Sequence, residues 1–109
     1  MFLIDTNIWL ERLLDQTASK EVGLFLNKFP SNQFQISDFS LHSIGVILHR
    51  LKKESLFLDF VNDILITGSA SFCSLFPEDM RNLTACIKKY KLDFDDAYQY
   101  VSAENMDQY

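Results

Sequence analysis

Glycine, proline and cysteine are all scarce in this chain of 109 residues, which contains three, two and two of them, respectively. The few glycines leave no glycine-rich phosphate loop and no Gly-x-Ser-x-Gly nucleophile elbow. Cys73 and Cys86 cannot form a disulfide framework, and their spacing fits no zinc motif. We therefore predict that both cysteines are small buried residues in a reducing cytoplasm.

An excess of basic charge is also missing. Ten lysines and arginines stand against 15 aspartates and glutamates, so the net charge is −5. Proteins that bind nucleic acid usually carry a basic surface. This chain either does not bind nucleic acid or binds it through a metal ion and a local basic strip. Acidic groups gathered in a cleft would attract divalent cations.

No apolar stretch approaches the roughly 20 residues of a membrane span. The N-terminus reaches an aspartate at position 5, and it lacks the positive start and long apolar run of a signal peptide. A cytoplasmic protein without a membrane segment is expected. Hydrophobic residues make up 48% of the chain, and ten of them are phenylalanines. Residues 1–109 are therefore predicted to form a single globular domain.

Short apolar runs alternate with helical patterns along the sequence. Strands are predicted over residues 2–4, 33–36 and 72–76. Helices are predicted over residues 6–14, 19–29, 39–53, 55–65, 77–90 and from 93 onward. The expected helix starts are Thr6 or Asn7, Ser19, Ser37 or Asp38, Ser55, Pro77 and Asp93. This alternation indicates an α/β fold with a short parallel sheet flanked by helices.

Asp5 is the most informative single residue. It directly follows the first predicted strand, and functional sites in parallel sheets form at the carboxyl ends of strands. An ionised side chain in this place loses hydration unless it finds a partner, and a divalent cation is one such partner. The alternative is that Asp5 only caps the helix that follows.

Asp93, Asp95 and Asp96 form an acidic cluster within four residues. Their mutual repulsion would favour a bound cation. The simpler alternative is that acids in the first helical turn interact with the helix dipole. His42 and His49 share one helical face and could form a metal site with Asp38, but solvent-facing histidines are the simpler interpretation.

Three segments together resemble the PIN domain of VapC-type toxins. Residues 1–10 read MFLIDTNIWL and are similar to the opening strand and first acid of that family. Residues 36–44 read ISDFSLHSI and resemble the segment from strand to helix that carries the second acid. Residues 92–97 read LDFDDA and resemble the segment in which the third acid precedes an alanine. The resemblance covers essentially the whole chain.

The resemblance implies a metal-dependent endoribonuclease that hydrolyses RNA with Mg²⁺ or Mn²⁺. Asp5 and Asp96 match catalytic metal ligands, and Asp93 or Asp95 would supplement them. Thr6, Asn7 and Ser43 would lie around the ligands and orient them. An antitoxin protein and a second copy of the chain are the implied partners.

Two departures leave an alternative open. Ser43 stands where the family has a glutamate, and a hydroxyl is a weaker metal ligand than a carboxylate. The family also continues into a strand with a fourth acid, so the chain is interpreted as truncated or naturally shortened. Without that strand, residues 2–4 would form an edge of the sheet. The alternative function is a weak or inactive PIN-like module that binds antitoxin or RNA.

Overall fold

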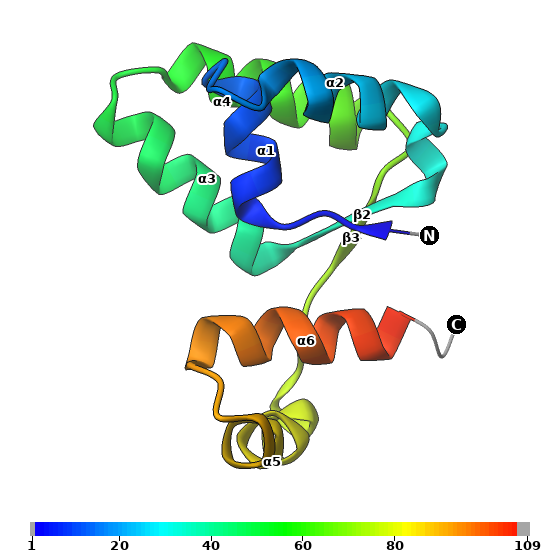
Figure 1. Ribbon diagram of the computed structural model, residues 1–109, viewed down its shortest axis with the longest axis vertical. Helices are drawn as coiled ribbons and strands as arrows, with labels where there is room; N and C mark the ends of the chain where they lie inside the picture. The colour runs from blue at the N-terminus through cyan, green and yellow to red at the C-terminus, as the bar shows by residue number, and fades with distance from the viewer. Residues whose placement is uncertain (1, 107–109) are drawn as a thin grey trace.

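A short parallel sheet organises residues 2–106, which are the residues that the computed structural model describes (Figure 1). Its strands are β1 (Phe2–Leu3), β2 (Phe34–Ser37) and β3 (Ser71–Cys73), in the order β1-β2-β3. Phe2 pairs with Phe34, and Gln35 pairs with Ser71. The predicted α/β class with a parallel sheet is confirmed. The third strand was predicted too long, because β3 ends at Cys73.

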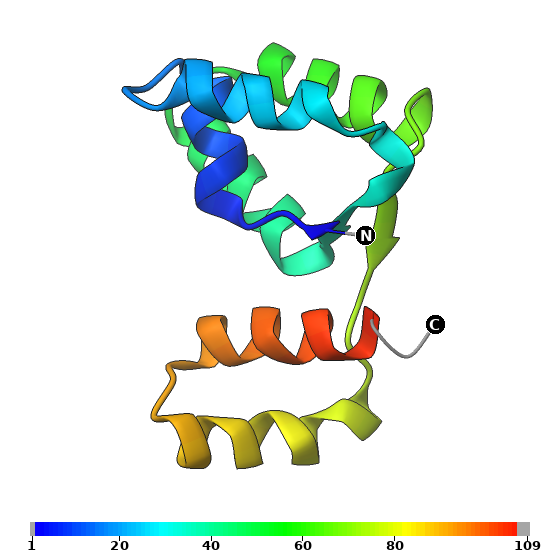
Figure 2. The same cartoon turned by 45° about the vertical axis from the view of Figure 1, so that its right-hand side comes forward.

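Helices fill both crossovers between the strands. α1 (Thr6–Leu13), α2 (Ser19–Lys28) and the 3₁₀ turn η1 (Ser31–Gln33) connect β1 to β2. α3 (Asp38–Arg50), α4 (Glu54–Phe60) and the π-helical stretch η2 (Val61–Ile66) connect β2 to β3. After β3 come the 3₁₀ turn η3 (Pro77–Asp79), α5 (Met80–Tyr90) and α6 (Phe94–Met106). α1–α4 lie on one side of the sheet, and the α5–α6 hairpin lies on the other (Figures 1 and 2).

Side-chain caps set several of the helix starts. Asp5 caps α1, because its Oδ1 accepts from the backbone N of Thr6 at 2.8 Å. The prediction of Thr6 or Asn7 as the cap was wrong by one or two residues. Ser37 caps α3 by accepting from Ser40 N at 3.1 Å, and Asp93 caps α6 by accepting from Asp96 N at 2.8 Å. The cap at Asp93 was predicted, and Ser37 was one of the two residues predicted to start α3.

Several helix ends differ from the predicted ones. Pro77 begins the 3₁₀ turn η3, and α5 begins only at Met80. Ser19 is the first residue of α2 and not its cap, and its hydroxyl accepts from Arg12 Nη1 at 3.3 Å. α3 ends at Arg50 and not at residue 53, because Lys52 adopts a left-handed conformation with φ of 58°. α4 begins at Glu54, so Ser55 is not its cap, and its last turns widen into the π-helix.

The molecule has two hydrophobic cores. The larger lies between the sheet and α1–α4, and its buried members are Ile4, Trp9, Leu10, Phe34, Ile36, Ile44, Leu48 and Phe60. The smaller lies between α5 and α6 and buries Leu83, Cys86, Ala97 and Val101. Cys86 is thus buried as predicted, whereas Cys73 is only partly buried; both are free thiols.

β1 lies at an edge of the sheet, since among residues 2–106 it pairs only with β2. Its outer side therefore leaves backbone donors and acceptors without strand partners in this part of the chain. Among residues 2–106, no helix is long and apolar enough to cross a membrane.

Candidate functional site

Polar side chains from three segments meet at the carboxyl edge of the sheet. Asp5 follows β1, Ser37 ends β2, and Ser40 lies in the first turn of α3. The N-terminal half of α6 passes beneath this edge and carries Asp96 and Gln99 (Figures 1 and 2). The sheet and α6 thus bring together residues that lie more than 90 positions apart in the sequence.

Gln99 is the centre of the hydrogen bonding in this cluster. Its Nε2 donates to Asp5 Oδ1 at 3.0 Å and to Ser40 Oγ at 2.7 Å. Its Oε1 accepts from Ser37 Oγ at 2.7 Å. Ser40 Oγ also accepts from Thr6 Oγ1 at 2.9 Å. Ser37 and Ser40 are fully buried, and each hydroxyl has at least one hydrogen-bond partner in this cluster.

Asp5 and Asp96 interact electrostatically across this edge. The pKa of Asp96 is raised above its ordinary value, chiefly by the negative charge of Asp93. Partial desolvation, a hydrogen bond with Asp93 and the charges of Asp5 and Asp95 add to that effect. Like charges so arranged disfavour ionisation, and a cation between them would relieve the repulsion.

The other residues predicted for the site take different places. Thr6 belongs to the cluster through Ser40, whereas Asn7 is exposed on α1. Ser43 lies one turn beyond Ser40 on α3 and is partly buried. The contacts that the sequence led us to expect of Ser43 are made by Ser40 instead. Asp95 is exposed, and Asp93 is engaged as the cap of α6.

Gln99, Ser37 and Ser40 were missed as site residues by the sequence argument. One signal could have found Gln99: it lies three residues after Asp96, and residues spaced by three share a helix face. Ser37 and Ser40 belong to the segment that follows the second strand, but we treated Ser37 only as a helix cap. Their part in the site depends on α6, which the local sequence does not reveal.

A second polar network lies beside the first and ties α6 to both α3 and β3. Asp38 Oδ1 accepts from Tyr98 OH at 2.6 Å and from Phe39 N at 2.8 Å, and its Oδ2 accepts from Ser74 Oγ at 2.8 Å. Tyr98 OH in turn accepts from Leu75 N at 3.1 Å. Burial, followed by the bond to Asp38, raises the pKa of Tyr98. The carboxylate of Asp38 is therefore engaged in structural hydrogen bonds, and His49, near the C-terminal end of α3, pairs with Glu54 at 2.9 Å.

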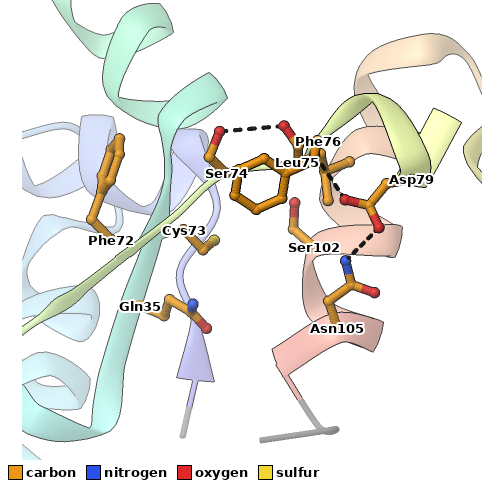
Figure 3. A pocket seen from close by; sticks show the side chains of 9 residues that line it. All are labelled: Gln35, Phe72, Cys73, Ser74, Leu75, Phe76, Asp79, Ser102 and Asn105. Atoms are coloured by element: carbon orange, nitrogen blue, oxygen red, sulfur yellow. Dashed lines mark hydrogen bonds between the residues drawn. The ribbon is translucent and has the colours of Figure 1, made fainter.

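A cavity of about 420 Å³ opens between β3 and the C-terminal half of α6 (Figure 3). Asp79 lines this cavity, but both of its carboxylate oxygens are hydrogen-bonded. Oδ2 accepts from Phe76 N at 2.8 Å, and Oδ1 accepts from Asn105 Nδ2 at 3.2 Å. Burial and the charge of Asp38 raise the pKa of Cys73 to about 11, so this thiol is protonated at neutral pH and a poor nucleophile. Neither Asp5 nor Asp96 lines the cavity.

The described residues contain no group of three or more His, Cys, Asp and Glu side chains arranged to hold a metal ion. Two carboxylates remain as candidates, Asp5 and Asp96. Both hydrogen bonds that Asp5 accepts in this region go to Oδ1, which leaves Oδ2 for a cation. Mg²⁺ is commonly held by one or two carboxylates together with waters and substrate phosphates. This pair suits such an ion better than an all-protein metal cage.

Comparison with known proteins does not assign the chain to a family. No protein-family model matches the sequence, and no curated protein is significantly similar to it.

Proposed function

We propose that this chain is a PIN-like, metal-dependent endoribonuclease of the VapC toxin type. The observation that carries the proposal is geometric: Gln99, one turn after Asp96 on α6, donates to Asp5 Oδ1 at 3.0 Å, which brings both acids to the carboxyl edge of one parallel sheet. Clustered carboxylates at such an edge suit a divalent cation, and the cation would let an acidic protein accept an anionic substrate.

In this mechanism, Asp5 and Asp96 would hold Mg²⁺ or Mn²⁺. When bound, the ion supplies charge neutralisation at the phosphate and lowers the pKa of a coordinated water. The residues around the two acids hold them in place. Thr6 N and Gln99 Nε2 fix Oδ1 of Asp5, and Asp93 fixes the start of α6, from which Asp96 projects. Asp93 and Asp95 add negative charge that raises the local concentration of cations.

A single-stranded RNA cleavage assay tests this proposal. Purified protein should cleave RNA slowly in Mg²⁺ or Mn²⁺ and should lose activity in EDTA. Asp5→Asn and Asp96→Asn should each abolish cleavage, because the amide carries no charge and binds metal more weakly. Asp59→Asn removes the same charge from the exposed surface of α4 and should leave cleavage intact. Cleavage that persists in both site variants would contradict the proposal.

A second candidate is a catalytically weak or inactive PIN-like module that binds RNA or an antitoxin. The observation that favours it is the absence, among residues 2–106, of a third acid placed with Asp5 and Asp96. Ser43→Glu would supply the acid that the resemblance to PIN domains expects. Higher Mn²⁺ affinity and faster cleavage in that variant would support a degenerate site. Unchanged values in a folded protein would show that position 43 is not the missing ligand.

An antitoxin protein and a second copy of the chain are the partners that this class implies. The free edge of β1 gives a physical reason for self-association, because unpaired backbone groups there lie beside apolar side chains. We expect the purified chain to be at least dimeric at micromolar concentration. Light scattering that reports a monodisperse monomer would remove the homodimer from the proposal.

A further inference from the structure

The carboxamide of Gln99 touches every other segment of the site. From α6 it reaches Asp5 after β1, Ser37 at the end of β2, and Ser40 on α3. All three contacts are between 2.7 and 3.0 Å. Asp5 is the only acidic side chain among these partners, so Gln99 presents its donor group to the first proposed metal ligand.

The hydrogen bonds around Gln99 favour one orientation of its amide. Ser37 Oγ already accepts from Ser40 N, so its own hydrogen is free to donate to Gln99 Oε1. Nε2 then faces Asp5 Oδ1 and Ser40 Oγ, which both act as acceptors. The reverse orientation would place the amide oxygen against the carboxylate and lose an attractive contact. Gln99 therefore presents its donor group to the carboxyl group of Asp5.

We propose that Gln99 is the positioning residue of the Asp5–Asp96 site, and that its amide occupies the place in which a third carboxylate would face Asp5. This inference rests on the proposed metal-dependent function. It identifies position 99 as the place where a third carboxylate is missing from the acidic site. By holding Oδ1 of Asp5, Gln99 directs the remaining oxygen, Oδ2, toward the cation. It acts through Asp5 and is not itself a metal ligand.

The variant Gln99→Glu follows directly from this geometry. One oxygen of the new carboxylate would keep the bond from Ser37. Ser40 could donate its own hydrogen to the other oxygen, since Ser40 Oγ only accepts in its two side-chain bonds. Asp5 would then be the one unfavourable neighbour, with two negative oxygens about 3 Å apart where Nε2 now donates. A divalent cation would convert that repulsion into coordination.

The test compares wild type, Gln99→Glu, Gln99→Ala and the control Gln33→Glu. Gln33 is exposed beside the start of β2, at the opposite end of the sheet, so its variant makes the same charge change away from the site. Mn²⁺ affinity is measured by titration calorimetry, and the midpoint of thermal unfolding is measured with Mn²⁺ and with EDTA. RNA cleavage is recorded separately.

Gln99→Glu should unfold at a lower temperature than wild type in EDTA and should gain more from Mn²⁺ than wild type does, because its affinity is higher. Gln99→Ala should bind Mn²⁺ about tenfold more weakly, as expected when a group that orients a ligand is removed. Gln33→Glu should match wild type in Mn²⁺ affinity. A Gln99→Glu protein that unfolds in EDTA and refolds on addition of Mn²⁺ would also support the proposal.

The inference would be overturned if Mn²⁺ raised the unfolding temperature of Gln99→Glu no more than that of Gln33→Glu. It would also be overturned if Gln99→Glu stayed unfolded in Mn²⁺. Wild-type affinity in Gln99→Ala would also overturn it. These results are separable from the fate of the nuclease proposal. If Gln99→Glu binds Mn²⁺ tightly but neither wild type nor any variant cleaves RNA, the nuclease proposal fails and the role of Gln99 stands. If cleavage depends on Asp5 but not on Gln99, the nuclease proposal stands and the positioning role of Gln99 fails.

Discussion

The body of the protein, formed by the sheet and α1–α4, differs from the α5–α6 hairpin in how it is held together. The body buries eight large apolar residues, with Trp9 and Phe60 packed edge to face at 5.2 Å. The hairpin buries four residues, Leu83, Cys86, Ala97 and Val101, and three of them are smaller than leucine. Because hydrophobic stabilisation scales with the apolar area removed from water, the body is the more stable of the two.

The two regions meet largely through polar contacts. Tyr98 and Gln99, on adjacent positions of α6, bond to Asp38, Ser37, Ser40 and Asp5 of the body. The candidate site lies at this junction, with one proposed ligand on each side. Hydrogen bonds fix direction better than apolar contacts do, at a net gain of only about 1 kcal/mol each. The junction therefore positions the two acids accurately while depending on few interactions.

The largest effect should come from truncating the body core. Leu48 is 0% exposed on α3, and Leu48→Ala should lower the free energy of unfolding by about 2–5 kcal/mol through lost burial and the cavity left behind. Urea unfolding followed by circular dichroism measures this change.

The matched variant is Leu83→Ala, which removes an equally buried leucine from the hairpin core. If the two regions differ as described, Leu83→Ala should abolish hydrogen-exchange protection in α5 and α6 while β2 and α3 keep theirs. Equal loss of protection throughout the chain would show that body and hairpin unfold as one unit.

The junction itself should be broken by Tyr98→Phe. Its hydroxyl donates to Asp38 and accepts from Leu75 N, so the variant leaves Leu75 N without this acceptor and removes one of the bonds to Asp38. A loss of about 1–3 kcal/mol in unfolding free energy is expected. The exposed Tyr100 lies two residues further on α6, and Tyr100→Phe should cost less. Equal costs for the two variants would mean that the Asp38 bond contributes little to the junction.

How far the sequence could predict this structure also differs between the two regions. The strand at residues 2–4 and the helices of the body follow from local apolar periodicity, and so does the parallel α/β class. Helix ends were less predictable, because they depend on single backbone conformations such as the positive φ of Lys52. Asp5 was recognised as a residue that could either cap α1 or bind a metal, and the structure shows that it caps.

Most contacts at the junction could not be predicted from the sequence. Gln99 and Tyr98 read only as members of the last helix, and their partners lie about 60 to 94 positions away. The resemblance pointed to Ser43 and did not single out Ser40, because a family pattern indicates which position to examine but not which side chain joins the cluster. Long-range polar contacts of this kind follow from the packing of α6, and no local pattern encodes that packing.

A smaller effect should separate Ser40 from Ser43 on the body side of the junction. Ser40→Ala removes the acceptor of both Thr6 and Gln99, so it should cost about 1–3 kcal/mol in unfolding free energy. Ser43→Ala, one turn along the same helix, should change stability less. Thermal unfolding of both variants measures the difference. A larger cost at position 43 would place the polar junction elsewhere on α3.

The smallest effect concerns Asp96, whose pKa is raised mainly by Asp93. A carboxyl with a raised pKa in the folded state favours folding while it is protonated, and that advantage is lost as the pH rises through its folded pKa. At neutral pH, the ionised Asp96 therefore opposes folding through its repulsion with Asp93, Asp5 and Asp95. Asp96→Asn removes that repulsion, so it should slightly raise the unfolding temperature at pH 7. The gain should disappear at a pH below the ordinary range of an aspartate, where wild-type Asp96 is neutral too. Because Asp96 is exposed, solvent screens these charges, and high salt should also reduce the gain.

Differential scanning calorimetry at both pH values measures this gain in unfolding temperature. A variant that is less stable than wild type at pH 7 would show that Asp96 makes a favourable contact that outweighs the repulsion. A variant that is more stable but unable to cleave RNA would show that the acid is kept for function at a cost in stability.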